Sequence, residues 1–245
     1  MERNTYRFFV PPESFHGAEV AVDDRDLAHQ LKAVLRLQPG AEITLLDGRG
    51  QRYHVELTAL DRNQIRGRIL ERGPAGGEPH TRLTIYAALI KAERFEWLLQ
   101  KGTELGVTRF VPLVSERSLP GTIGEAKQAR WQRILREAAE QSLRGRVPEL
   151  CAPMPFAAAC NAVGEQGFLL WEAEGGTPLR VALRQITASS LAILSGPEGG
   201  FTNAEAELAR QHGVRAITLG PRILRAETAP LVAAVAILYE RDDLR

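Results

Sequence analysis

The chain has 245 residues, of which 44% are hydrophobic and 25% are charged, a balance typical of a globular protein and not of a disordered one. A formal net charge of +1 neither indicates nor excludes a nucleic-acid partner, because local distribution of charge matters more than its sum. No stretch reaches the roughly 20 apolar residues that span a bilayer, and two cysteines, Cys151 and Cys160, are too few for a disulfide framework or a zinc site. We expect a cytoplasmic protein that has no membrane partner and binds no metal.

The first 73 residues contain short runs of β-forming residues separated by turn residues. Four of these runs predict strands: Arg7–Val10, Glu42–Leu46, Arg52–Leu57 and Gln64–Leu70. Asp47–Gly50 predicts a hairpin loop, because its glycines tolerate positive φ. A helix is expected over Asp24–Leu35, with an apolar face made of Leu27, Leu31, Val34 and Leu35. Together these elements predict a small β-barrel-like domain over residues 1–73.

Residues 74–80 are rich in proline and glycine and predict a linker. From residue 81 to 245, expected strands alternate with expected helices. The strands are Leu83–Ile90, Phe110–Val114, Gly167–Trp171, Leu191–Leu194 and Ala216–Leu219. The helices are Arg94–Leu105, Gly124–Leu143, one that opens at Thr177-Pro178, Asn203–His212, and Glu227–Glu240 with Leu231, Ala234, Val235 and Leu238 as its buried stripe. This alternation predicts an α/β domain whose mainly parallel sheet is covered by helices on both faces.

A glycine-rich segment lies where one of these strands meets its helix. Leu191–Glu205 passes from an apolar run through Ser195–Gly200 to Thr202 and Glu205, which are spaced for a capping box. Its glycines allow the backbone to approach a ligand, and ligands bind beyond the carboxyl ends of parallel strands. The segment lacks the signatures of a P-loop, a dinucleotide fold and a hydrolase nucleophile. A purely structural glycine-rich turn is the alternative.

A second segment, Ile217–Pro230, also joins a strand to an apolar helix. The strand ends at Gly220-Pro221, and the loop that follows carries Arg222, Arg225 and Glu227. A connection with no other role does not need arginines and a glutamate at the start of the helix. The alternatives are a surface loop with a chance ion pair and, for Glu227, N-terminal capping of the helix.

As a pair, Ser195–Gly200 and Leu219–Ala229 resemble the cofactor loops of the RsmE-type methyltransferases, a family of the SPOUT class. Weaker matches follow in the same order along nearly the whole chain: Arg7–Phe9, His29–Gly40, Lys101–Val107, Ser115–Arg117 and Glu137–Ser142. The resemblance implies a SPOUT α/β trefoil-knot domain over residues 81–245 and a PUA- or OB-like RNA-binding domain over residues 1–73. It also implies a homodimer whose interface includes the last helix.

The resemblance further implies a function: S-adenosylmethionine-dependent methylation of N3 of a specific uridine in small-subunit (16S) ribosomal RNA. The cofactor, S-adenosyl-L-methionine, would be held by residues of both loops and of one neighbouring strand end. These are Leu170, Trp171, Leu194, Ser195, Gly196, Pro197, Glu198, Gly199, Gly200, Leu219, Gly220, Ile223, Leu224, Arg225, Thr228 and Ala229.

Two further groups of residues are assigned roles in the same way. Arg225 is the candidate that stabilises negative charge on the base, and Glu227 or Glu198 would orient that arginine or accept a proton. Contacts to RNA are expected from basic residues of the first domain and the long helix region: Arg7, His29, Lys32, Arg36, Arg117, Arg144 and Arg146. Each of these alone is more often a solvated surface group, and as a set they favour RNA.

Three other functions fit parts of the sequence. A SPOUT enzyme acting on transfer RNA would keep the class and change the substrate. A non-catalytic ribosomal-RNA-binding or ribosome-assembly protein would keep the fold and lose the cofactor. A nucleotide-binding enzyme would use Gly196–Gly200 as a phosphate site, and competition between ATP and S-adenosylmethionine would separate it from a methyltransferase.

Overall fold

The computed structural model describes residues 6–119, 123–171 and 176–244. The chain divides into two compact units. The N-terminal unit comprises Met1–Glu78 together with Ala139–Val147, and the C-terminal unit comprises Pro79–Ala138 together with Pro148–Arg245. Ala139–Val147 is therefore grouped with the N-terminal unit, although the sequence pattern places it after the linker.

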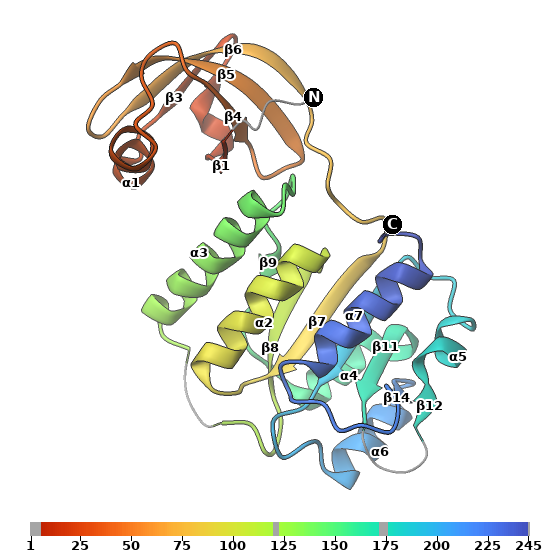
Figure 1. Cartoon of the computed structure of the whole chain (residues 1–245). Helices are drawn as coiled ribbons and strands as arrows, with labels where there is room; N and C mark the ends of the chain where they lie inside the picture. The colour runs from red at the N-terminus through yellow and green to blue at the C-terminus, as the bar shows by residue number, and fades with distance from the viewer. Residues whose placement is uncertain (1–5, 120–122, 172–175, 245) are drawn as a thin grey trace. The chain divides into compact units, whose positions relative to one another are not determined.

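The N-terminal unit is built on one six-stranded mixed sheet with the order β1-β4-β5-β6-β3-β2 (Figure 1). Its strands are β1 (Arg7–Phe9), β2 (Phe15–His16), β3 (Glu19–Val22), β4 (Glu42–Leu46), β5 (Gln51–Leu60) and β6 (Ile65–Pro74). Strand β1 runs parallel to β4, and the other pairs are antiparallel. The expected β-rich domain is confirmed, with β1 and β2 as the edge strands of its sheet in the described residues.

Two details of this sheet follow directly from the residue types. Between β4 and β5, Gly48 and Gly50 adopt positive φ, as the expected hairpin loop requires. The Asp47 carboxylate accepts hydrogen bonds from the backbone N–H groups of Arg49 and Gln51 and so closes the loop. Strands β2 and β3 were not predicted, because strands of two and four residues are too short to establish an alternating pattern.

The expected helix at Asp24–Leu35 is only partly correct. Asp24 caps α1 (Arg25–His29), and the chain continues through Gln30–Val34 in a wider π-helical turn. There the backbone N–H of Leu35 donates to the carbonyl of Gln30, five residues earlier. The wider turn rotates the following side chains, so Leu27 and Leu31 are buried while Val34 is 64% exposed.

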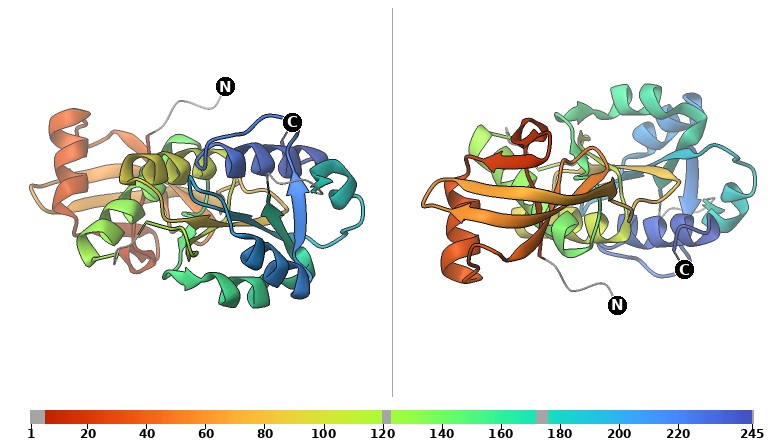
Figure 2. Two further views of the ribbon diagram at one scale, coloured as in Figure 1. Left: turned by 90° about the horizontal axis from the view of Figure 1, so that it is seen from below. Right: turned by 90° about the horizontal axis from the view of Figure 1, so that it is seen from above.

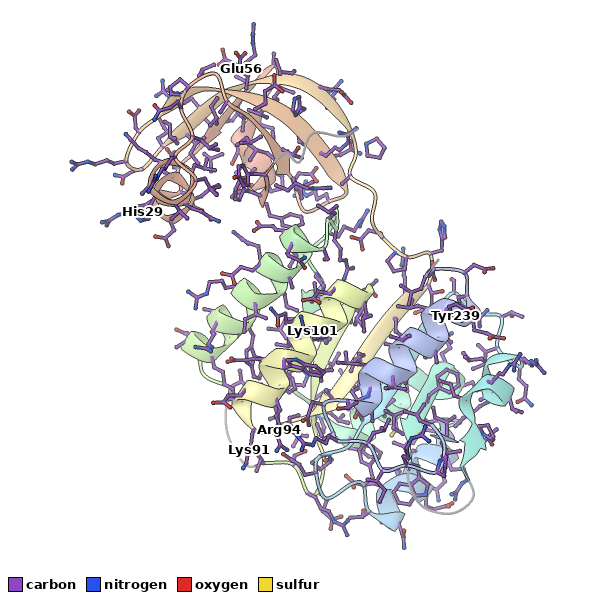
Figure 3. The ribbon with its side chains drawn as sticks, viewed as in Figure 1. His29, Glu56, Lys91, Arg94, Lys101 and Tyr239 are labelled. Carbon is purple, nitrogen blue, oxygen red and sulfur yellow. The ribbon has the colours of Figure 1, made fainter. Side chains whose placement is uncertain are left out.

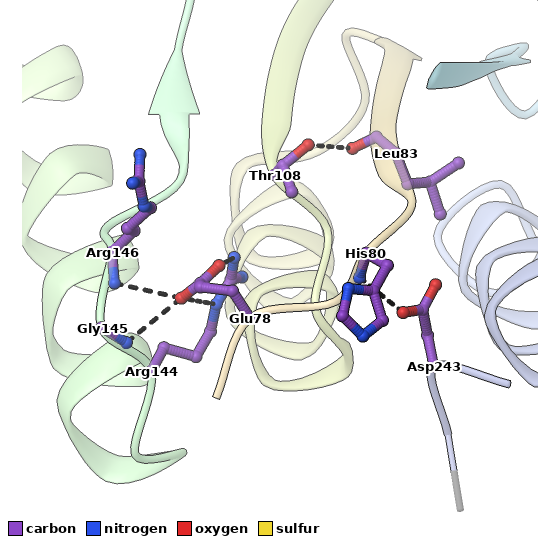
Figure 4. A network of polar contacts seen from close by, with 8 residues as sticks. All are labelled: Glu78, His80, Leu83, Thr108, Arg144, Gly145, Arg146 and Asp243. Carbon is purple, nitrogen blue, oxygen red and sulfur yellow. Dashed lines mark hydrogen bonds and ion pairs between the residues drawn. The ribbon is translucent and has the colours of Figure 1, made fainter. Parts of the chain in front are cut away.

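The segment Ala139–Val147 is fixed within the N-terminal unit by the Glu78 carboxylate (Figure 4). This carboxylate accepts a 2.7 Å hydrogen bond from Arg144 Nη2 and further bonds from the backbone N–H groups of Gly145 and Arg146. Arg144 is only 2% exposed. Its guanidinium is enclosed and paired with Glu78, which supports a structural role for Arg144. The RNA contact expected of Arg144 stays a prediction.

The C-terminal unit is built on a parallel sheet with the order β10-β8-β7-β13-β11-β14-β12, and β9 adds to β8. Its strands are β7 (Arg82–Ala88), β8 (Arg109–Val114), β9 (Glu149–Leu150), β10 (Met154–Pro155), β11 (Gly167–Leu170), β12 (Thr177–Pro178), β13 (Ser190–Ser195) and β14 (Arg215–Thr218). Every pair among them is parallel. The predicted α/β architecture is confirmed.

Helices cover both faces of this sheet: α2 (Ala92–Leu105), α3 (Glu125–Gln141), α4 (Phe156–Val163), α5 (Leu179–Leu183), α6 (Asn203–Gln211) and α7 (Ala229–Glu240). Helices α2 and α7 pack together on one face, and α4 and α6 pack together on the other (Figure 2). The sequence did not predict α4, because its apolar and small residues give no polar face from which to recognise a helical period.

Helix α7 begins at Ala229 and not at Glu227 as expected. Leu231, Ala234 and Leu238 are buried as predicted. Val235 is 40% exposed, so its place in the buried stripe was wrong. The buried face is completed by Ile237 and small alanines instead, because an almost entirely apolar helix offers no polar side from which to locate the exposed residues.

Both cysteines are free thiols, as expected. Cys160 is fully buried, and its pKa is raised to about 11 by that burial and by the negative charge of Glu205. Within the described residues, no helix combines the length and the apolar content needed to cross a membrane.

Candidate functional site

Three neighbouring strands of the C-terminal unit end at the same edge of its sheet. Because β13, β11 and β14 are adjacent and parallel, their carboxyl ends lie side by side there. A cavity of about 480 Å³ lies at this edge. It is lined by Arg94, Leu170, Trp171, Ser195, Gly196, Pro197, Glu198, Gly200, Ile217, Thr218, Leu219, Gly220, Pro221, Arg222, Ile223, Leu224, Arg225, Ala226 and Ala229.

The loop after β13 is a compact turn held by its own polar groups. The Thr202 hydroxyl accepts a hydrogen bond from the backbone N–H of Glu205, and the Glu205 carboxylate accepts one from the N–H of Thr202, so the predicted capping box is confirmed. A Cβ at Gly196 would lie 3.2 Å from the Phe201 ring. Glycine therefore lets the turn pack closely against this ring, and Gly196 also lines the cavity.

The loop after β14 depends on a glycine at its start. Gly220 has φ of 111°, a conformation that side-chain-bearing residues rarely adopt, and its N–H donates to the Thr218 hydroxyl at 3.2 Å. At the other end, the N–H groups of Thr228 and Ala229 both donate to the carbonyl of Arg225 and form the turn into α7. These contacts set a curved backbone whose residues 219–226 all line the cavity.

Charged groups meet beside the two loops. Arg94, in the first turn of α2, donates from Nη1 to Glu198 Oε1 at 3.3 Å, and its Nε lies 3.8 Å from Glu227 Oε1. Figure 3 places Arg94 next to Lys91 at the beginning of α2. Glu227 is only 7% exposed, and its Oε2 has no hydrogen-bond partner among the described residues. The structure gives it no capping bond to α7, whose N-cap is Thr228.

Most residues expected to hold a cofactor line this cavity, and three do not. Leu194 is 0% exposed within β13. The carbonyl of Gly199 accepts a 2.7 Å hydrogen bond from Arg117 Nη1. Thr228 lies in the turn that begins α7. None of these three is among the residues that line the cavity, whereas all the other expected residues are.

Three lining residues lie outside the segments predicted to hold the cofactor: Arg94, Ile217 and Thr218. Pro221, Arg222 and Ala226 also line the cavity; they belong to the predicted loop Leu219–Ala229 but were not named individually as cofactor contacts. Ile217 and Thr218 end strand β14, so the strand pattern itself could have indicated them. Arg94 belongs to neither glycine-containing loop and carries no local signal. Only the packing of α2 beside the carboxyl ends of the strands brings it to the site.

The residues expected to contact RNA fall in both units. His29, Lys32 and Arg36 are exposed on α1 and the turns after it, and Figure 3 labels His29 there. Arg146 is exposed in the N-terminal unit, where its guanidinium reaches within 3.2 Å of the position that a Cβ on Gly50 would occupy. Arg7 is partly buried at the start of β1. Arg117 belongs to the C-terminal unit and is exposed while it holds the Gly199 carbonyl.

Comparison with protein families gives two matches. Residues 77–238 match the model described as an RNA methyltransferase domain, and residues 22–70 match the model described as an RNA methyltransferase PUA domain. The first match covers more than half of the chain.

Individual relatives agree with these models. The chain is 39% identical over 236 residues to ribosomal RNA small subunit methyltransferase E from Synechocystis, covering 95% of this chain and 77% of that one. The Bacillus subtilis protein of the same name is 35% identical, with 96% and 93% covered. A crystal structure of ribosomal RNA small subunit methyltransferase E from Neisseria gonorrhoeae bound to S-adenosylmethionine is 31% identical, with a TM-score of 0.85 over 96% of this chain and 98% of that one.

Proposed function

Because the chain belongs to the RsmE family of S-adenosylmethionine-dependent ribosomal RNA methyltransferases, we propose that it methylates N3 of one uridine in small-subunit (16S) ribosomal RNA. The observation that carries the proposal is the cavity formed by the ends of β11, β13 and β14, which gathers most of the residues expected to hold the cofactor. The chain is accordingly an enzyme, and RNA is its substrate.

The residues around the cavity fit S-adenosylmethionine. A volume of about 480 Å³ lies within the range of about 300–1,000 Å³ that small-molecule sites occupy. Leu170, Leu219 and Leu224 offer apolar packing. Gly196 and Gly200 line the cavity without side chains of their own, so the backbone there can approach a ligand. When bound, the cofactor supplies the electrophilic methyl group.

The remaining chemistry falls to charged side chains of the chain itself. Uridine N3 carries a proton and lies on the pairing edge, so the base must be unpaired or flipped out to react. Arg225, exposed on the cavity wall, stabilises the negative charge that the base acquires as the proton leaves. Glu227 and Glu198 both lie beside Arg94. One of these two carboxylates orients Arg225 or accepts that proton.

RNA recruitment belongs mainly to the N-terminal domain, proposed to span residues 1–73 before a linker at 74–80. His29, Lys32 and Arg36 provide exposed positive charge there, and phosphate contacts of this kind give affinity without sequence information. Arg7, Arg146 and Arg117 are the other candidates. The enzyme would act in the cytoplasm, where ribosomal RNA is found.

The family resemblance adds two further proposals, a trefoil knot in the domain at residues 81–245 and a homodimer. Helix α7 supports the dimer, because Val232, Val235 and Tyr239 are 41%, 40% and 69% exposed at helical spacing. Such an apolar stripe is typical of an interface. Light scattering would detect the dimer, and Val235→Glu with Tyr239→Glu should convert it to a monomer.

Calorimetric titration with S-adenosylmethionine, S-adenosylhomocysteine and ATP tests the proposed function. We expect saturable binding of the first two ligands, weakened in Gly220→Val, and no binding of ATP. Binding of ATP alone would favour the nucleotide-binding alternative. If none of the ligands binds to a folded protein, with or without ribosomal RNA present, the chain is a non-catalytic RNA-binding protein and the proposal fails.

A further inference from the structure

Arg94 lies at the cavity but outside both of the loops that form it. It belongs to the first turn of α2, more than a hundred residues before Glu198 in the chain. The helix that carries it is anchored by the buried side chains of Phe95, Leu98 and Leu99. Arg94 therefore lies on a rigid helix, whereas most of the cavity wall is formed by loops.

The guanidinium of Arg94 has one carboxylate from each loop within reach. Its Nη1 donates to Glu198 Oε1 at 3.3 Å, in the loop after β13. Its Nε lies 3.8 Å from Glu227 Oε1, in the loop after β14. One cation thus bridges the two segments that the sequence predicts as a pair of cofactor loops. A weaker link between the same loops is the 3.4 Å hydrogen bond from the Ser195 hydroxyl to the carbonyl of Ala226.

The burial of Glu227 makes this bridge consequential. The residue is 7% exposed, and its Oε2 has no hydrogen-bond partner in the described part of the chain. A buried carboxylate is costly unless a cation or hydrogen bonds compensate it. Arg94 is the cation that the structure brings within 4 Å of this carboxylate among the described residues. Without it, Glu227 would be driven toward water and would carry its loop along.

We propose that Arg94 is a positioning residue that holds the two cofactor loops at their working separation by pairing with Glu198 and Glu227. The inference rests on the proposed function for its consequence, which is cofactor affinity. Its structural part, the coupling of the loops through Arg94, is independent of which ligand the cavity takes. Arg94 itself carries out no step of methyl transfer.

The test compares wild-type protein with Arg94→Gln, Arg94→Lys, Glu227→Gln and the double variant Arg94→Gln/Glu227→Gln. Arg130→Gln is the matched control, since it removes the same group from a pair with Glu96, two residues along α2 from Arg94. Circular dichroism and thermal melting first establish that each variant is folded. Calorimetry then gives the dissociation constant for S-adenosylmethionine, and hydrogen exchange without ligand reports on residues 196–202 and 219–229.

We expect Arg94→Gln to weaken binding about tenfold, the loss of one modest ionic contact at the site, with Arg94→Lys intermediate. The double variant should bind more tightly than Arg94→Gln alone, because it no longer leaves a buried charge without its cation. Exchange should rise in both loops of Arg94→Gln and in neither loop of Arg130→Gln.

Equal affinity and equal exchange in wild-type protein and folded Arg94→Gln would overturn the inference. So would a double variant that binds no better than Arg94→Gln, because the two residues would then act separately. The wild-type protein could also bind no S-adenosylmethionine while exchange in both loops still rises in Arg94→Gln. That result would contradict the proposed function and would still support the coupling of the loops.

Discussion

Each of the two units contains an arginine that pairs with a carboxylate. The two sites differ in how many of the carboxylate oxygens have hydrogen-bond donors. In the N-terminal unit, Arg144 is 2% exposed and pairs with Glu78 at 2.7 Å. The same carboxylate also accepts the N–H groups of Gly145 and Arg146. In the C-terminal unit, Arg94 is shared between Glu198 at 3.3 Å and Glu227 at 3.8 Å.

This difference separates structural pairs from functional ones. A carboxylate whose oxygens are occupied by fixed donors has nothing left to offer a ligand, so Glu78 serves to fix a turn. Glu227 is buried with an unpartnered oxygen beside a cavity in the described part of the chain, which is a costly arrangement that natural proteins keep mainly at functional sites. The comparison predicts opposite consequences when each arrangement is broken.

The largest effect is expected from Glu78→Ala. It removes the carboxylate that accepts hydrogen bonds from Arg144 and from two backbone N–H groups, which should lower the free energy of unfolding by about 3 kcal/mol. Urea titration followed by circular dichroism measures this loss. Glu71→Ala is the control, because Glu71 is 64% exposed and pairs with Arg52 at the surface; it should change stability by less than about 1 kcal/mol. A loss from Glu78→Ala as small as that of the control would refute the structural role.

The next effect is expected from Arg225→Ala. If Arg225 stabilises the developing charge on the base, kcat should fall about a hundredfold while stability changes little. Steady-state methylation assays give kcat and KM for both substrates. Arg222→Ala, from the same loop and also on the cavity wall, is the matched control. Equal losses in the two variants would mean that neither arginine has a special place in the reaction.

A smaller effect is expected from Gly220→Val. At φ of 111° a β-branched residue is strained by about 1–3 kcal/mol, so the loop should relax and cofactor affinity should fall about tenfold. Gly76 also has positive φ, with nothing within 4 Å of its Cβ position, and belongs to the N-terminal unit. Gly76→Val should therefore lower the melting temperature and leave the affinity for the cofactor unchanged. A tenfold fall in cofactor affinity in Gly76→Val as well would argue against a specific role of the loop after β14.

The smallest effect concerns Asp243 in the C-terminal unit (Figure 4). Burial acts to raise the pKa of its carboxyl, but hydrogen bonds from Thr81 and His80 outweigh burial and lower that pKa below 3.8. A lowered pKa in the folded state means stabilisation that is present at neutral pH and lost as the pH falls below 3.8 through the folded value. Asp243→Asn should cost about 1 kcal/mol or less at about pH 7, and a difference from wild type that persists undiminished at about pH 2.5 would contradict this.

Local sequence signals were sufficient for most of the fold. The alternation of apolar strands and amphipathic helices predicted the parallel sheet, and α2 ends at Leu105 as expected, with Gly106 at φ of 105° after it. The failures have physical causes. Val34 is misplaced because a π-helical turn changes the helical period, and α4 was missed because it has no polar face.

The candidate site shows the same limit. The two loops were recognisable because glycines and charged residues have no purely structural reason to occur together there. Arg94 was not recognisable, because its place beside Glu198 and Glu227 comes from packing between segments far apart in the chain. The burial of Arg144 was not recognisable either, since its sequence neighbours do not reveal that it pairs with Glu78.

The most direct test of the central claim is to identify the methylated atom. Purified protein would be incubated with S-adenosylmethionine carrying an isotopically labelled methyl group and with unmethylated small ribosomal subunits or their RNA. The RNA would then be digested to nucleosides for mass spectrometry. We predict label in N3-methyluridine at a single site, strongly reduced in Arg225→Ala. Label in a ribose 2′-O-methyl group, or no label from a protein that binds the cofactor, would contradict the account.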